Sequence, residues 1–271
     1  MKTPVSTSAT LKAAAPDLIP PRKYKQYAGW LVLIAVLIAC SIRTEVTPYQ
    51  LITGLPQMGS LLREMFPPDW SYLSTIWGPM METVQIAILG TTLGGLLAIP
   101  VALLCASNLA ISRYVSLPAR MILNLIRTIP DLLFAAIFVA VFGIGPFAGM
   151  LALVFFSFGI IAKLTFEAIE AIDPGPLEAM TAVGANRMQL IMFGVVPQAL
   201  PYFMSYLLYT FEVNVRAAAV LGLVGAGGIG LLLDRALGLF RYDRASVIIL
   251  LTLVIVLVID YGSTIIRRKL L

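Results

Sequence analysis

The chain has 271 residues, of which 59% are hydrophobic and 12% charged, with a formal net charge of +5; its mean hydropathy is +0.93. This composition excludes an ordinary soluble globular domain. The basic residues lie beside apolar segments rather than in one patch, so no nucleic acid partner is predicted. The sequence contains no histidine, and we predict no catalytic residue, metal site or cofactor.

The N-terminal part is predicted to hold a tail and the first membrane span. Residues 1–26 combine basic side chains with Pro16, Pro20 and Pro21, and we expect a flexible cytoplasmic tail there. Residues 27–42 form the first apolar run, and residues 27–271 are predicted to form one transmembrane domain. Residues 37–40 resemble a lipoprotein cleavage box, but the preceding basic region is too long for a signal peptide, so cleavage is not predicted.

Further apolar runs have lengths suited to crossing about 30 Å of hydrocarbon. They cover residues 80–107, 117–142, 146–163, 202–224 and 245–266, and a short surface helix is expected at residues 61–66. Six spans place Arg113, Arg120 and both basic termini on one side, as the positive-inside rule requires, whereas five would put one terminus outside. We therefore predict an all-α membrane protein with six transmembrane helices. Cys40 and Cys105 fall in apolar runs and are interpreted as small hydrophobic residues.

Residues 167–201 are the longest polar interruption between apolar segments in the second half of the chain. Asp173 is a good N-cap before a proline, and Gly184 suits the end of a short helix. Asn186 and Gln189 have the spacing of a capping box that starts a second helix. We expect two short helices joined by a bend, and an apolar docking face formed by Met188, Ile191, Met192 and Val195. An ordinary cytoplasmic loop is the alternative.

A glycine-rich segment precedes the last span. Gly225, Gly227 and Gly230 match G-x-G-x-x-G, with Gly228 between them. No strand or βαβ pattern surrounds the motif, so we predict a backbone bend, or gate, rather than a nucleotide site. The chain also lacks a P-loop sequence, and ATP hydrolysis by such a loop is excluded.

The polar segment resembles the EAA loop of binding-protein-dependent ABC importer permeases. The resemblance lies in Glu178-Ala179-Met180, then Gly184 and then Pro197, at the spacing of that family. Met180 stands where alanine is usual, Gly194 where isoleucine is usual, and Val196 where leucine is usual. Together with residues 167–176 and the glycine-rich segment, the pattern resembles the phosphonate-transporter permeases from about residue 65 onwards.

The resemblance implies the type I ABC importer permease (MetI-like) fold in the inner membrane, without an ATPase site of its own. It implies two ATPase subunits as partners, a periplasmic or lipid-anchored substrate-binding protein, and a second permease subunit, most simply in a homodimer. The implied substrate is phosphonate or a related oxyanion (phosphite, hypophosphite or phosphate). Another solute such as methionine, or a membrane enzyme or non-transporting scaffold, is the alternative. The residues implied in coupling to the ATPase are Glu178, Ala179, Gly184, Asn186 and Pro197, and we expect Glu178 in the first turn of its helix.

Charged residues inside predicted spans are candidates for the substrate pathway, because an ionisable group there is costly and usually faces a partner or a cavity. Arg127 and Asp131 are spaced to share one helix face, and Glu212 and Arg216 repeat that spacing. Two interpretations are open: internal ion pairs that hold the bundle together, or arginines that attract a passing oxyanion. Asn214 belongs to the same candidate set.

Overall fold

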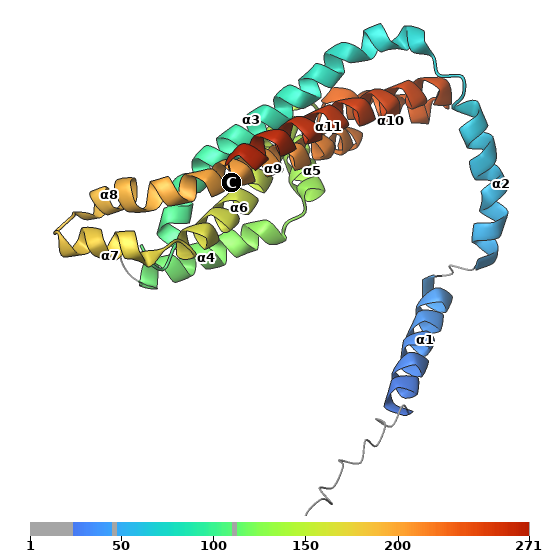
Figure 1. Ribbon diagram of the computed structural model, residues 1–271. Coiled ribbons are helices and arrows are strands. Elements are labelled where there is room, and N and C mark those ends of the chain that lie inside the picture. Colours follow the sequence, from blue (N-terminus) through green and yellow to red (C-terminus); the bar gives the residue numbers. More distant parts are fainter. Residues whose placement is uncertain (1–23, 45–47, 110–112, 271) are drawn as a thin grey trace, which may run out of the picture. The chain divides into compact units, whose positions relative to one another are not determined.

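A computed structural model describes residues 24–44, 48–109 and 113–270, and most of the expected N-terminal tail lies outside these ranges. The described residues form helices and turns, with no strand among them (Figure 1). The main helices are α1 (Tyr24–Thr44), α2 (Pro48–Glu64), α3 (Leu73–Cys105), α4 (Arg113–Thr128), α5 (Asp131–Phe142), α6 (Pro146–Glu170), α7 (Pro174–Ala182), α8 (Arg187–Gln189), α9 (Val196–Leu221), α10 (Gly228–Gly238) and α11 (Tyr242–Leu270). Short 3₁₀ turns lie at Trp70–Tyr72 and Gly222–Val224, and a π-helix lies at Leu190–Val195.

Within the described residues, five helices or helix runs are long and apolar enough to cross a membrane, and a bent pair makes a sixth candidate. The five are Tyr27–Thr44, Trp70–Cys105, Pro146–Glu170, Arg187–Val224 and Tyr242–Leu270. The bent pair is Tyr114–Thr128 with Asp131–Phe142, whose axes meet at 85°. The predicted all-α class with six candidate spans is therefore confirmed.

The third span predicted over residues 117–142 is a bent pair of helices and not one straight helix. Helix α4 ends at Thr128 and α5 begins at Asp131. Pro130 between them has no N–H to donate and disfavours a helical conformation in Ile129. The chain therefore turns sharply where hydropathy alone predicted continuity. Helix α2 also differs from the short surface helix expected at residues 61–66, because it spans 17 residues and ends at Glu64.

Helices α3, α6 and α9 form the centre of the part that covers residues 61–270. Gly90 and Gly94 on α3 lie against α6. A Cβ added at Gly90 would lie 2.5 Å from Cβ of Leu153, and one added at Gly94 would lie 2.6 Å from Cβ of Ser157. Small residues at such positions let two helix backbones approach closely in lipid, where apolar burial alone gives little drive for association.

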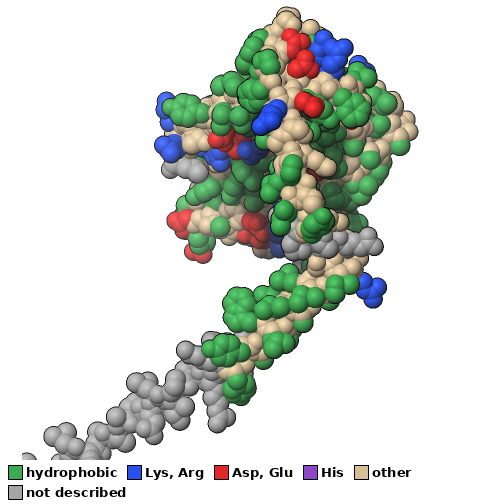
Figure 2. Space-filling view, turned by 90° about the vertical axis from the view of Figure 1, so that its right-hand side faces the viewer, with side chains coloured by type: hydrophobic (Ala, Val, Ile, Leu, Met, Phe, Trp, Pro, Cys, Tyr) green, Lys and Arg blue, Asp and Glu red, His purple; other side chains and the backbone are tan. Residues whose placement is uncertain are grey.

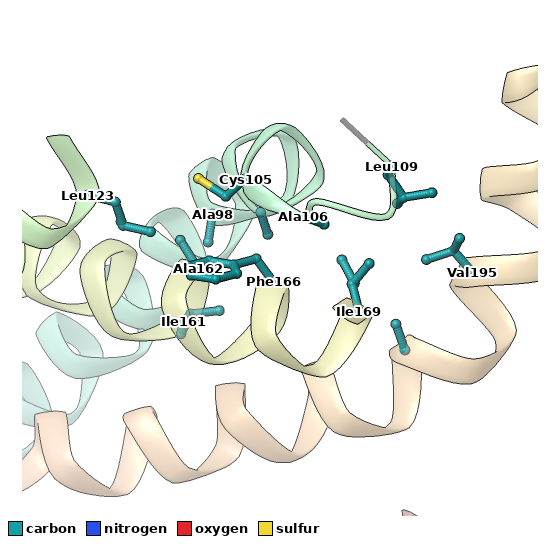
Figure 3. Packing of buried hydrophobic residues seen from close by; sticks show 12 residues of the cluster. Ala98, Cys105, Ala106, Leu109, Leu123, Ile161, Ala162, Phe166, Ile169 and Val195 are labelled. Carbon is teal, nitrogen blue, oxygen red and sulfur yellow. The ribbon is translucent and has the colours of Figure 1, made fainter. Parts of the chain in front are cut away.

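At one end of this centre, a cluster of small and aliphatic residues surrounds Phe166 of α6. Figure 3 shows Cys105, Ala106 and Leu109, from the end of α3 and the turn after it, gathered on the side of α6 that carries Phe166 and Ile169. Cys105 and Ala106 have no exposed surface, and Leu109 is 5% exposed. Elsewhere, hydrophobic side chains cover much of the visible surface, as expected for helices that face lipid (Figure 2).

Candidate functional site

The polar segment folds as a helical hairpin, residues 173–195, at one end of the helix bundle (Figure 1). Asp173 caps α7, accepting a hydrogen bond at 2.9 Å from the Gly175 amide through Oδ1. Gly184 ends this arm with a φ of +82°, a backbone region that favours glycine. Asn186 starts the next arm with a capping box, in which its side chain and that of Gln189 each accept from the other's backbone N–H at 2.9 and 2.8 Å. These predicted caps are confirmed.

Two details of the predicted hairpin are wrong. Because α7 begins at Pro174, Glu178 is its fifth residue and lies beyond the first turn, so the helix dipole does not explain it. The second arm is also not a separate short helix. It runs from α8 through the π-helix directly into α9, so that Arg187–Val224 is a continuous run of 38 residues.

The apolar face expected for docking is divided between interior and surface. Val195 is 1% exposed and packs in the cluster around Phe166, with Ile191 beside that cluster. Met188 and Met192 are 68% and 53% exposed. The remaining candidate coupling residues, which are Glu178, Ala179, Gly184, Asn186 and Pro197, are all exposed and therefore accessible to a partner.

Two departures from the usual EAA pattern meet in space. Gly194 is buried, and a Cβ added to it would lie 3.3 Å from Sδ of Met180 and 3.7 Å from Cγ of Leu177. A larger side chain on one arm is thus accommodated by the smallest residue on the other. The departures at residues 180 and 194 are therefore compatible with the same hairpin packing.

Gln198 joins the two arms at their base and was not found from the sequence. Its Oε1 accepts from the Asp173 amide at 3.1 Å, and its Nε2 donates to the Gly194 carbonyl at 2.9 Å. A cavity of about 440 Å³ opens beside it, lined by residues of α6, the turn after α6 and α9: Ala168, Ala171, Ile172, Asp173, Gln198, Tyr202 and Tyr206. The one sequence feature that could have pointed to Gln198 is its position directly after Pro197 of the EAA-like motif.

The structure does not pair Arg127 with Asp131. These residues lie on different helices either side of the 85° bend, and no ion pair joins them among the described residues. The stem of Arg127 packs against Gly159 of α6, where an added Cβ would meet its Cγ at 2.9 Å. Asp131 accepts the Leu132 amide at 2.9 Å in the first turn of α5, where negative charge is favoured.

Glu212 and Arg216 do form the predicted pair, at 3.1 Å. Glu212 is 7% exposed, and its second oxygen accepts from Arg267 of α11 at 2.8 Å. Asp260 of α11 also lies close to this carboxylate. The Arg216 side chain remains 50% exposed. The two-residue pair expected from sequence is thus part of a four-residue charged cluster between α9 and α11.

Asn214 has no exposed surface. Its Nδ2 donates to Thr91 Oγ1 of α3 at 2.7 Å and to Ser157 Oγ of α6 at 2.6 Å. Buried polar groups need such partners, because an unpaired one is expensive in a low-dielectric interior. Through these two bonds Nδ2 of Asn214 joins α9 to α3 and α6, whereas its Oδ1 is buried without a hydrogen-bond partner among the described residues.

The glycine-rich segment is a tight bend, as predicted. Gly225, Gly227 and Gly228 have φ values of +86°, +81° and +69°. The amide of Ile229 at the start of α10 donates to Thr83 Oγ1 of α3 at 2.8 Å. A Cβ added at Gly230 would lie 2.0 Å from the Ala219 carbonyl oxygen, so that α10 fits against the end of α9 only with glycine there. Helices flank the motif, so the described residues lack the strand that precedes the glycines in a dinucleotide-binding fingerprint.

Comparison with known proteins assigns the family. Residues 98–271 match the family described as binding-protein-dependent transport system inner membrane component. The chain belongs to this family. The permease is 37% identical over 238 residues to the phosphite transport system permease protein PtxC of Stutzerimonas stutzeri, covering 88% of this chain and 86% of that protein. It is 37% identical over 241 residues to the phosphate-import permease protein PhnE of Mycolicibacterium smegmatis, covering 88% of this chain and 45% of that protein.

The fold of the permease is also seen in a solved transporter. The MetNI methionine ABC transporter in an inward-facing conformation contains a chain that aligns with a TM-score of 0.65 and 23% identity, over 75% of this chain and 99% of that chain. At this level of identity the likeness concerns the fold alone. The predicted MetI-like importer permease fold is confirmed.

Proposed function

We propose that this permease moves a phosphorus oxyanion, such as phosphonate, phosphite, hypophosphite or phosphate, across the inner membrane. The observation that carries the proposal is the 37% identity to PtxC, a phosphite transport permease, over most of both chains. The relation to a phosphate-import permease supports the same class of solute. Methionine is the weaker candidate, because the likeness to MetNI rests on fold at 23% identity.

The proposed energy source is a pair of separate ATPase subunits that bind the hairpin. Two capped helices with an exposed tip form a protrusion suited to a cleft on a partner, and Glu178 offers that partner a charge. A substrate-binding protein outside the membrane and a second permease subunit, most simply an identical one, complete the proposed transporter.

The proposed orientation follows from the basic residues. We place both termini and residues 166–198 in the cytoplasm, and residues 44–76 and 231–243 outside, because the positive-inside rule assigns Arg120 and the basic C-terminal end of α11 to the cytoplasm. Single cysteines at Ser6, Gln57 and Thr181, in a background lacking Cys40 and Cys105, test this with an impermeant thiol reagent on intact cells. Labelling at position 57 alone supports the orientation, and labelling at position 181 refutes it.

Uptake into liposomes tests the function itself. The permease, reconstituted with the ATPase and binding protein encoded beside it, should take up at least one of phosphite, methylphosphonate and phosphate in an ATP-dependent manner, and should not take up methionine. Glu178→Lys should leave the permease in the membrane but abolish most ATP-driven uptake, because it reverses the charge on the proposed docking surface. Normal uptake by Glu178→Lys would show that this residue does not serve coupling.

A further inference from the structure

The turn after α3 is bonded both to the end of α6, just before the hairpin, and to the second arm of the hairpin. This turn, residues 105–109, which we call the clasp, offers both its amides and its carbonyls to neighbouring side chains. Glu170, at the end of α6 just before the hairpin, accepts from the backbone N–H of Ser107 at 2.7 Å and from its hydroxyl at 2.5 Å. Arg187, at the start of the second arm, donates to the Leu109 carbonyl.

The clasp also joins the ends of two membrane helices to each other. Arg120 of α4 donates to the Cys105 carbonyl through Nε at 2.7 Å and Nη2 at 2.5 Å, and pairs with Glu170. Asn108 donates to the Ile169 carbonyl at 2.7 Å. Carbonyls in the last turn of a helix have no intrahelical partner, so these side chains satisfy orphan acceptors of α3 and α6 at once.

A packed aromatic ring, that of Phe166, restricts the movement of the side chains that bind the clasp. Phe166, 3% exposed, lies beneath Arg120 and Lys163, whose charged ends are 4.9 and 4.6 Å from the ring centre. Cations over an aromatic face are held by its quadrupole, more strongly when partly desolvated. Because Cys105, Ala106 and Leu109 of the clasp pack in one cluster with Phe166 and Ile169 of α6 (Figure 3), the clasp has few ways to move independently of α6.

We infer, on the basis of the proposed coupling to an ATPase, that the clasp transmits displacement of the hairpin to α3. Glu170 and Arg187 are the positioning residues that fix the clasp to the end of α6 and to the second arm of the hairpin. Helix α3 extends from the clasp to Thr83, about 33 Å away at 1.5 Å per residue, where it accepts the amide of Ile229 in the glycine-rich bend. One continuous helix thus connects the hairpin end of the permease to the bend. The clasp adds a second route into the bundle beside α9.

The test measures solute taken up per ATP hydrolysed in the reconstituted transporter, with phosphite, methylphosphonate and phosphate as probes. Glu170→Ala removes the carboxylate that accepts from the Ser107 amide and hydroxyl, and Arg187→Met removes the donor to the Leu109 carbonyl. Each should lower uptake per ATP roughly three- to thirtyfold, the range in which residues that couple two sites usually act. Glu170→Gln, which keeps an oxygen for the Ser107 amide, should recover part of the loss.

Glu167 is the matched control, because it lies one turn earlier on α6 and pairs at 2.6 Å with Lys163 while its side chain is 49% exposed. Glu167→Ala should leave uptake per ATP within twofold of the unmodified permease. Unchanged uptake per ATP in Arg187→Met overturns the inference. It does so even if Glu170→Ala loses uptake, when that loss comes only from failed assembly. If Glu178→Lys uncouples transport and the clasp variants do not, the clasp inference fails while the proposed function stands.

Discussion

The carboxylate of Glu212 on α9 is shared between Arg216 of the same helix, at 3.1 Å, and Arg267 of α11, at 2.8 Å. The three residues are not equivalent, because the Glu212 side chain is 9% exposed and that of Arg216 is 50% exposed. Removing either arginine leaves the carboxylate one partner. Removing the carboxylate leaves two cations with Asp260 of α11 as the remaining nearby acid.

We therefore expect Glu212→Gln to destabilise the permease by about 3 kcal/mol, as for a broken buried ion pair. Arg216→Gln should cost under about 1 kcal/mol, as for an exposed pair. Thermal unfolding of the purified permease in detergent measures both. Uptake by the double variant Glu212→Gln/Arg216→Gln then separates the two roles of Arg216. Near-normal uptake leaves Arg216 as a structural partner, whereas uptake as poor as that of Arg216→Gln alone supports a role in attracting the anion.

Arg127 and Asp131 provide a contrasting pair for the same measurement. They have the same spacing in sequence, but the bend between α4 and α5 separates their helices. The effects of Arg127→Gln and Asp131→Asn on stability should therefore add, whereas those at Glu212 and Arg216 should not. A strong departure from additivity at residues 127 and 131 would contradict the bent geometry.

At the tip of the hairpin, Gly184 is required for its backbone conformation and not because a side chain would clash there. Its φ is +82°, yet a Cβ added there meets nothing within 4 Å. Gly184→Pro should abolish ATP-driven uptake, because proline fixes φ near −65°. Gly184→Asn should retain most uptake, because asparagine tolerates the left-handed region better than other side chains. Equal activity of the two variants in the reconstituted transporter would show that this conformation is not required.

Met180 and Gly194 should behave as a compensating pair. Gly194→Ile should destabilise the permease by about 1–3 kcal/mol, since it crowds the sulfur of Met180 and the side chain of Leu177. Adding Met180→Ala should restore much of that loss by making room. A double-mutant cycle on unfolding temperature checks this. Strictly additive effects would mean that the two side chains do not share the space.

Gly230 and Gly238, both on α10, test the tight bend. Gly230→Ala places a Cβ 2.0 Å from the Ala219 carbonyl oxygen, whereas Gly238→Ala meets nothing within 4 Å. Gly230→Ala should lower the free energy of unfolding by about 3 kcal/mol or more, because the backbone must shift to relieve the contact. The second should change stability by no more than about 1 kcal/mol. The yield and unfolding temperature of the two purified variants report the difference, and equal values would contradict the packing of α10 against α9.

Local chemistry made part of this site predictable. The caps at Asp173 and Asn186 depend on side chains within three residues of the backbone groups they satisfy, so a sequence motif suffices to predict them. The turn at Gly184 depends only on the tolerance of glycine for a positive φ. The apolar runs likewise report membrane spans, because each span must be apolar over its own length.

Partners distant in sequence were not predictable in the same way. Arg267 lies 55 residues from Glu212, and Glu170 lies 63 residues from Ser107. No local pattern relates such pairs, since they meet only after the helices pack. The bend at Pro130 was missed for another reason: hydropathy averages over a window and does not register a single missing N–H.

The π-helix at Leu190–Val195 has a mechanical consequence. No flexible linker separates the second arm of the hairpin from α9, so the run Arg187–Val224 is one rod of roughly 55 Å for its 38 residues. The rod packs against α6 and α3 along its membrane portion. Because Arg187 at the hairpin end of the rod donates to the Leu109 carbonyl, a partner that displaces this end should either tilt the whole rod against the clasp or rewind the π-helix. A tilt about the packed middle would swing the opposite end, next to the glycine-rich bend, in the reverse direction.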